Sequence, residues 1–265
     1  MAWRIVPWLC GLLAVSWSVA AAAPRGEAPV IAAAADLKFA MEEIAAGFTN
    51  ETKHEVKLAF GSSGNFASQI EQGAPFQMFL SADENFVFRV ADLGKTVDRG
   101  QLYAVGRIVL MIPKGSPLRP DPTLQDLAAA LGDGRLRRFA IANPEHAPYG
   151  RRAEEALRAA DLWERIKGRL VLGENVAQAA QFATAGGAQG GIIAYSLARS
   201  PVVAALGTFA PISDAWHSPL RQRMVLLNGA GPTARMFYHY MQQPPARAIL
   251  VRYGFVLPGD LPSDR

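Results

Sequence analysis

The chain has 265 residues, of which half are apolar and 19% are charged, and this composition excludes a disordered tail and a disulfide scaffold. Its 27 basic and 23 acidic residues give a formal net charge of +4, too small an excess to indicate a nucleic-acid partner. The single cysteine, Cys10, can form neither an internal disulfide nor a thiolate metal site. The length allows one large domain or two of ordinary size.

The first 22 residues have the pattern of a secretory signal peptide. Arg4 precedes an uncharged run over residues 5–23, which is apolar at first and rich in alanine at its end. A membrane anchor is the alternative, but the run is barely long enough to span a bilayer. We expect cleavage before Ala23 and a periplasmic mature chain that is not embedded in a membrane and contains no cysteine.

From residue 30 onwards, short apolar strands alternate with helical patterns. Strands are predicted at residues 30–34, 56–60, 77–80, 108–112, 139–142, 170–172, 191–194 and 224–227. Helices are predicted at residues 37–48, 66–72, 83–91, 124–131, 151–160, 176–185, 234–241 and 246–253. This alternation predicts an α/β fold with mainly parallel sheets, and two α/β domains with a ligand cleft between them fit the length.

Four strand-to-helix junctions share a form in which small or polar residues precede the helix. They lie at residues 32–36, 61–64, 143–150 and 173–176. The start of each helix exposes free backbone N–H groups and the positive end of the helix dipole. Helix starts that converge on one cleft would bind an anion without a charged side chain.

Individual residues at these junctions are candidate donors to an anion. Ser63 can cap its helix and still offer a hydroxyl group. Asn175 and Gln178 have the spacing of a capping box, which leaves the amide of Val176 near the helix tip. A proline at the start of the third of these helices leaves the amide of Tyr149 pointing outward.

Seven segments in order resemble the periplasmic molybdate-binding proteins of ABC transporters, over about residues 30–255. They are AAAADLKFAM at 32–41, FGSSG at 60–64, QIEQGAP at 69–75, SAD at 81–83, NPEHAPYG at 143–150, ENV at 174–176 and RYGF at 252–255. The resemblance implies a type II periplasmic-binding-protein fold that closes over molybdate or tungstate and delivers it to an ABC permease. It implies no catalysis and no cofactor.

The resemblance also implies a domain division and a ligand set. Domain I would comprise residues 23–107 and 221–265, and domain II residues 108–220, in a chain that acts as a monomer. Molybdenum would be bound only as molybdate, whose oxygens contact the Ser63 hydroxyl and the amides of Tyr149 and Val176.

Two positions depart from the family pattern. The first ligand position, often serine or asparagine, is Asp36, and a carboxylate about 4 Å from a dianion costs roughly 4 kcal/mol for each pair of like charges at an effective dielectric near 20. Asp36 could cap its own helix, be protonated, or accept a proton from an oxyanion such as hydrogen phosphate; we favour the cap.

A family tyrosine aligns on Ala194, with Tyr195 one place later, so Tyr195 is a less certain ligand because the shift reverses the face of a strand.

Two other functions remain as alternatives. The first is binding of another oxyanion, such as phosphate. The second is a periplasmic hydrolase with Ser63 as nucleophile, although the segment lacks the Gly-x-Ser-x-Gly elbow. Near the expected cleft, His146 is interpreted as part of a structural loop, and Arg151 and Arg152 as a solvated helix face.

Overall fold

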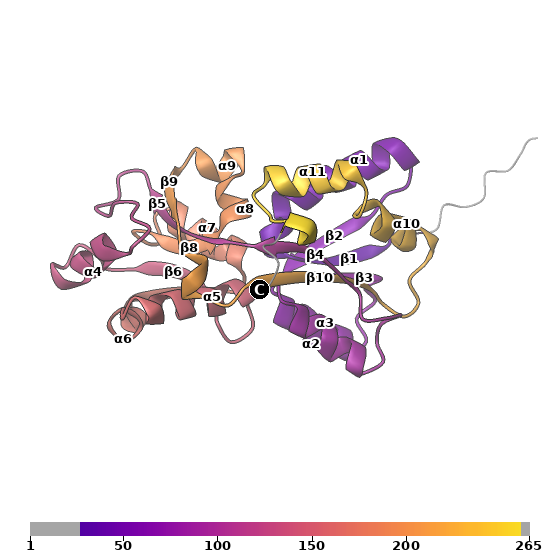
Figure 1. Cartoon of the computed structure of the whole chain (residues 1–265), viewed down its shortest axis with the longest axis horizontal. Helices are drawn as coiled ribbons and strands as arrows, with labels where there is room; N and C mark the ends of the chain where they lie inside the picture. The colour runs from indigo at the N-terminus through magenta and orange to yellow at the C-terminus, as the bar shows by residue number, and fades with distance from the viewer. Residues whose placement is uncertain (1–26, 261–265) are drawn as a thin grey trace, which may run out of the picture.

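The computed structural model describes residues 27–260, so the predicted signal peptide lies outside the described residues. Two five-stranded sheets form the two α/β domains that the sequence predicts, and each sheet has helices on both faces (Figure 1). Within residues 27–260, no helix has both the length and the apolar character that crossing a membrane requires.

The first sheet has the strand order β2-β1-β3-β10-β4. Its strands are β1 (Val30–Ala34), β2 (Lys57–Gly61), β3 (Met78–Ser81), β4 (Gln101–Gly106) and β10 (Leu220–Leu226). One face is covered by α1 (Lys38–Thr52), α10 (Pro232–Tyr240) and α11 (Pro244–Arg252), and the other by α2 (Ser63–Glu71) and α3 (Glu84–Asp92) (Figure 1). The helix predicted at residues 37–48 agrees with α1, whose apolar face packs Ala40, Met41, Ile44 and Phe48 in the core.

The second sheet has the strand order β7-β6-β8-β5-β9. Its strands are β5 (Ile108–Pro113), β6 (Phe139–Ala142), β7 (Leu170–Gly173), β8 (Gly191–Ala194) and β9 (Gly207–Pro211). The helices of this domain are α4 (Gln125–Gly132), α5 (Pro148–Ala159), α6 (Trp163–Ile166), α7 (Val176–Thr184), α8 (Tyr195–Ala198) and α9 (Pro201–Ala204). Ala34, Ala35 and Ala82 of the first domain join the apolar core of the second, so the two domains pack directly on each other.

The sheets are mixed rather than mainly parallel, which corrects the prediction. Strand β10 runs antiparallel to β3 and β4, and β5 runs antiparallel to β8 and β9. The reason is the way in which the chain crosses between the domains. Only Arg107 separates β4 from β5, so one continuous extended segment passes from the first sheet into the second, and the chain returns after β9.

Candidate functional site

A small cavity lies where the two domains meet. Its lining includes residues from all four predicted junctions, so helix starts from both domains face the same space. The full lining is Ala34, Ala35, Asp36, Gly61, Ser62, Ser63, Ala82, Ala147, Pro148, Tyr149, Asn175 and Val176. A space bounded by several helix N-termini is suited to an anion, because free N–H groups and helix dipoles point into it.

Ser63 lines this cavity, but it is not the helix cap. Ser62 is the N-cap of α2, and its side chain accepts a hydrogen bond from the Asn65 amide at 3.4 Å. Ser63 is the first residue of the helix and is fully buried, and its Oγ accepts a hydrogen bond from the Ala82 amide at 3.0 Å. The hydroxyl hydrogen of Ser63 remains available to a ligand, since the bond from Ala82 uses the oxygen.

The two predicted backbone donors lie at the starts of α5 and α7. Helix α5 begins at Pro148 and its N-cap side chain makes no capping bond, which leaves the Tyr149 amide in the uncapped first turn. The Oδ1 atom of Asn175 accepts hydrogen bonds from the amides of residues 177 and 178, at 3.0 and 3.1 Å. The amide of Val176 is therefore left without this cap, as the sequence predicts.

Asp36 is buried beside these donors, and its side chain does not make the capping bond that we favoured. Its Oδ2 atom accepts hydrogen bonds from Gln222 Nε2 at 2.6 Å and from the Tyr149 hydroxyl at 3.0 Å. Burial raises the pKa of Asp36 to about 7, because the loss of hydration outweighs these two bonds and the neighbouring backbone amides. The carboxyl group is thus close to the boundary between its neutral and charged forms at neutral pH.

Tyr195 lies away from the cavity. It is the first residue of α8, its amide donates to the carbonyl of Arg107 at 2.9 Å, and its ring packs edge-on against Phe209 at 5.6 Å between centroids. The family tyrosine aligns on Ala194, the last residue of β8, whereas the tyrosine of this chain comes one residue later. This difference of one position directs the side chain of Tyr195 away from the cavity. The tyrosine hydroxyl that reaches the site is that of Tyr149, a role that the sequence did not indicate.

Contacts between the domains close the cavity on the side of α2. The Gly64 amide donates to the His146 carbonyl at 3.0 Å, and the Ser62 hydroxyl pairs with His146 Nδ1 at 2.9 Å. His146 is therefore part of the domain contact and not only of its loop. The imidazole reaches Ser62 rather than Ser63, so within residues 27–260 the alternative nucleophile Ser63 has no basic partner.

Gly64 is expected to be sensitive to substitution because of this contact. A Cβ atom at Gly64 would be 2.6 Å from the His146 carbonyl oxygen, so Gly64→Ala must separate the domains slightly. We expect about a tenfold loss of ligand affinity, the lower part of the range for overpacking. Gly132→Ala is the matched control, since a Cβ there meets nothing within 4 Å. Equal affinities of the two variants, measured by calorimetry, would contradict this role of Gly64.

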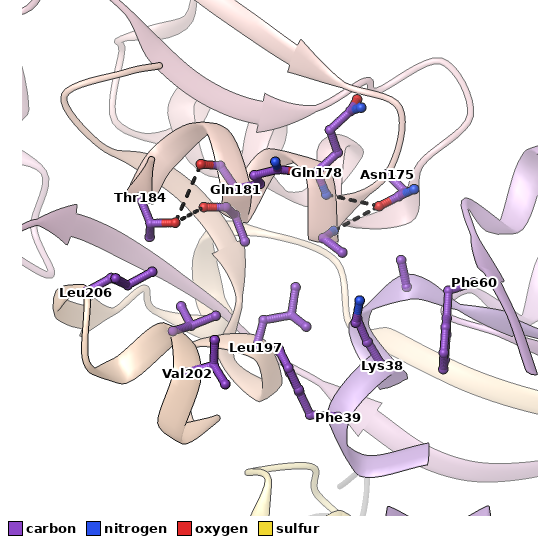
Figure 2. Close-up of a pocket in the computed structure, with 14 residues that line it drawn as sticks. Lys38, Phe39, Phe60, Asn175, Gln178, Gln181, Thr184, Leu197, Val202 and Leu206 are labelled. Carbon is purple, nitrogen blue, oxygen red and sulfur yellow. Dashed lines mark hydrogen bonds between the residues drawn. The ribbon is translucent and has the colours of Figure 1, made fainter. Parts of the chain in front are cut away.

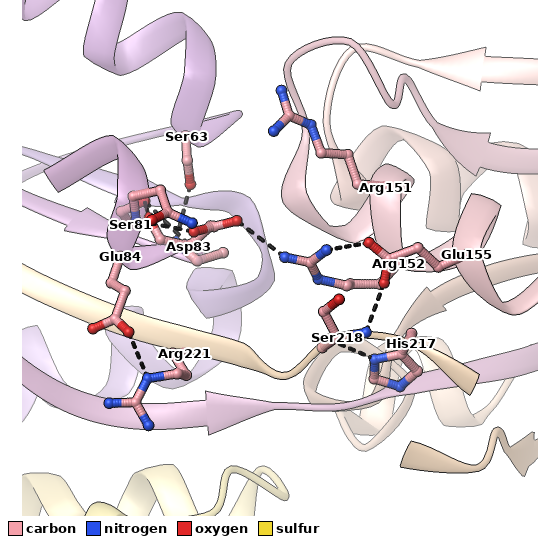
Figure 3. A network of polar contacts seen from close by, with 12 residues as sticks. Ser63, Ser81, Asp83, Glu84, Arg151, Arg152, Glu155, His217, Ser218 and Arg221 are labelled. Atoms are coloured by element: carbon pink, nitrogen blue, oxygen red, sulfur yellow. Dashed lines mark hydrogen bonds and ion pairs between the residues drawn. The ribbon is translucent and has the colours of Figure 1, made fainter. Parts of the chain in front are cut away.

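A buried ion pair between α5 and the start of α3 also joins the domains (Figure 3). Arg152 Nη2 lies 3.1 Å from Asp83 Oδ2, and both residues are less than 9% exposed. Arg152 also pairs with Glu155, which accepts the Ser218 amide at 2.6 Å. The interpretation of Arg152 as a solvated residue was wrong: its helix face turns towards the first domain, and only its neighbour Arg151 is exposed.

A wider groove lies beside the cavity and shares Ala35 and Asn175 with it (Figure 2). One wall carries polar side chains of α7, including Gln178, Gln181 and Thr184. Among the described residues that line the groove, Lys38 is the one that carries a charge, and its side chain is exposed. Helix starts do not converge on the groove as they do on the cavity, so the smaller space is the better candidate for an anion site.

Two α/β domains that enclose a cavity lined by backbone donors define a solute-binding protein. The chain belongs to the family of bacterial extracellular solute-binding proteins, whose model matches residues 29–256. It is 34% identical over 250 residues to the molybdate-binding protein ModA of Rhodobacter capsulatus, which covers 93% of this chain and 95% of the relative. For ModA of Escherichia coli, the identity is 33% over 252 residues, with coverages of 92% and 95%.

The fold agrees with these sequence comparisons. The periplasmic molybdate-binding protein of Azotobacter vinelandii superposes with a TM-score of 0.79 at 28% identity, covering 88% of this chain and all of that chain. The comparisons confirm the family resemblance that the seven sequence segments indicate.

Proposed function

We propose that this protein is a periplasmic receptor that captures molybdate or tungstate and delivers it to an ABC permease. The relatives described above, 33 to 34% identical over nearly their whole length, are molybdate-binding proteins. The protein would act as a monomer, would be exported by cleavage of residues 1–22, and would make and break no covalent bond in its ligand.

The observation that supports this proposal is the convergence of uncharged donors on one cavity between the domains. The Ser63 hydroxyl comes from the first domain, and the amides of Tyr149 and Val176 come from the second. A tetrahedral dianion bound between them would be held by hydrogen bonds to charge, which are about twice as strong as neutral ones. Exclusion of water strengthens such bonds further.

Closure of two domains is the proposed means of capture. We assign residues 23–107 and 221–265 to domain I and residues 108–220 to domain II. This division is supported by the sheets, since β1–β4 and β10 form one and β5–β9 form the other. Closure brings Ser63 to the two amides, and the connections around Arg107 are where the domains would hinge.

Calorimetric titration of the mature protein with molybdate, tungstate, sulfate and phosphate tests this function. We expect molybdate and tungstate to bind much more tightly than sulfate, because the cavity has a fixed size and sulfate is smaller. The absence of molybdate binding at concentrations up to about millimolar, equivalent to about 4 kcal/mol of binding free energy, would refute the proposal.

The Ser63 hydroxyl provides a variant that tests the ligand set. We expect Ser63→Ala to weaken molybdate binding about 10- to 100-fold, the value of one hydrogen bond to a charged group. Ser68→Ala on the same helix is the matched control, since Ser68 interacts with Arg89 outside the cavity. If Ser63→Ala binds molybdate as tightly as Ser68→Ala does, Ser63 is not a ligand.

A second candidate function is binding of a protonated oxyanion such as hydrogen phosphate. Asp36 favours this candidate, because a carboxylate can accept a hydrogen bond from the ligand proton. The same calorimetric series distinguishes the two, since the second candidate predicts tighter binding of phosphate than of molybdate above neutral pH.

A further inference from the structure

The carboxyl group of Asp36 supports an inference that deepens the proposed function and rests on it. Asp36 is 1% exposed and lines the same cavity as Ser63, Tyr149 and Val176. Its Oδ2 atom accepts two hydrogen bonds, whereas its Oδ1 atom is buried and has no hydrogen-bond partner among residues 27–260. A buried oxygen without a partner is costly, so Oδ1 needs either a proton or a ligand.

The neighbours of Asp36 determine which oxygen can carry a proton. Gln222 is fully buried, and its Oε1 atom accepts a hydrogen bond from the Tyr103 hydroxyl at 2.6 Å. This bond turns the Gln222 amide nitrogen towards Asp36 Oδ2, which also accepts from Tyr149. Since Oδ2 already has two donors, a proton on the carboxyl group belongs on Oδ1.

The groups that pack against Asp36 supply no positive charge. Among the described residues, these groups are Tyr149 of α5, Gln222 of β10, Tyr103 of β4 and Ser196 of α8. Burial raises the pKa of both tyrosines well above the ordinary value, so they stay neutral. The nearest imidazole at the cavity is that of His146, which contacts Ser62. An ionised Asp36 beside a dianion would therefore face uncompensated repulsion in a dry cavity.

We propose that Asp36 makes oxyanion capture proton-coupled: a dianion binds together with one proton. This proton stays bonded to Asp36 Oδ1, and the resulting O–H group donates a hydrogen bond to an oxygen of the anion. The proton comes from the solvent, and the O–H bond on Asp36 is the single bond formed. A monoprotonated oxyanion such as hydrogen phosphate brings its own proton, and its O–H group donates a hydrogen bond to Oδ1 of the ionised carboxylate. Asp36 thereby determines which protonation state of an oxyanion the cavity accepts.

The direction of the pH dependence follows from the burial of Asp36. Its pKa is raised to about 7 in the closed domains, and a bound dianion raises it further. Below this pKa the carboxyl group is neutral and binding of molybdate is unimpaired. As the pH rises above it, the proton must be taken up from solvent, and affinity falls by up to about tenfold per pH unit.

Calorimetry in two buffers of different ionisation enthalpy measures the protons taken up with each molybdate. For the wild-type protein between about pH 7 and about pH 8.5, we expect uptake of between about half and one proton, with Kd rising by about threefold per pH unit near pH 7 and about tenfold per unit near pH 8.5. Asp36→Asn retains an acceptor for Gln222 and Tyr149 and places a permanent donor at Oδ1. We expect no uptake and no pH dependence in this variant, and tighter binding than wild type at the upper pH. Glu145→Gln, an exposed carboxylate changed in the same way, should behave as wild type.

Three outcomes are distinguishable. Molybdate binding without proton uptake or pH dependence in the wild-type protein would overturn the inference and leave the proposed function intact. A pH dependence that persists in Asp36→Asn and is lost in His146→Gln would also overturn it, since the imidazole would be the titrating group. The absence of molybdate binding at every pH would refute the proposed function instead.

Discussion

Replacement of Arg152 by methionine is expected to weaken molybdate binding by about 30- to 1,000-fold, or about 2 to 4 kcal/mol. Asp83 and Arg152 are buried against each other between the domains, and removal of the arginine leaves the buried carboxylate without its partner. In an open form, with the domains apart as the proposed function requires, Asp83 would be hydrated and the loss would cost little. The substitution therefore acts on the closed, ligand-bound form, and calorimetry with molybdate measures it.

Matched variants separate this ion pair from general effects on α5. Arg158→Met changes an exposed arginine on the same helix, which pairs with Glu154 within the second domain, and should leave affinity unchanged. Asp83→Asn retains the cap on α3, because its remaining oxygen can still accept the Asn85 amide. If Arg152→Met and Arg158→Met bind molybdate equally well, the ion pair does not stabilise the closed form.

Val176→Pro is expected to weaken molybdate binding by about 10- to 100-fold through the loss of a single backbone N–H group. Val176 is the first residue of α7, a position where proline is favoured because its missing N–H has no helical partner. Asn175 has extended backbone angles, φ −148° and ψ 175°, which are compatible with a following proline. The helix should therefore remain while the donor to the anion disappears.

Val176→Ala is the control for this substitution. It removes the packing of the buried side chain but keeps the amide, so we expect a change of less than about threefold in Kd. Circular dichroism of both variants checks that α7 is retained. If the alanine and proline variants lose the same affinity, the Val176 amide is not a ligand and the side chain accounts for the effect.

Local sequence patterns were sufficient to predict most of the fold. The predicted strand at residues 30–34 agrees with β1, and the helix predicted at residues 37–48 lies within one residue of the start of α1. Strands β4 and β9 were missed because their ends carry glycine, glutamine or proline, and these interrupt the alternation of a strand. The antiparallel strands could not be predicted either, because strand direction depends on where the chain crosses between domains.

The candidate site shows the same division between local and long-range information. Helix starts are local features, and the sequence placed Ser63, Tyr149 and Val176 at three of them. The burial of Arg152 and the pairing of Gln222 with Asp36 depend on residues that lie 69 and 186 positions apart in the chain. A single sequence contains no signal for such pairs beyond a polar residue in a strand or an arginine near a helix start.

The location of bound molybdate tests the central claim most directly. Anomalous scattering at the molybdenum edge, recorded from crystals of the protein grown with molybdate, locates the metal without reference to the rest of the map. We predict one strong peak in the cavity lined by Ser63, Tyr149 and Val176, beside the carboxyl group of Asp36. A peak in the neighbouring groove beside Lys38, with the cavity left empty, would contradict the account.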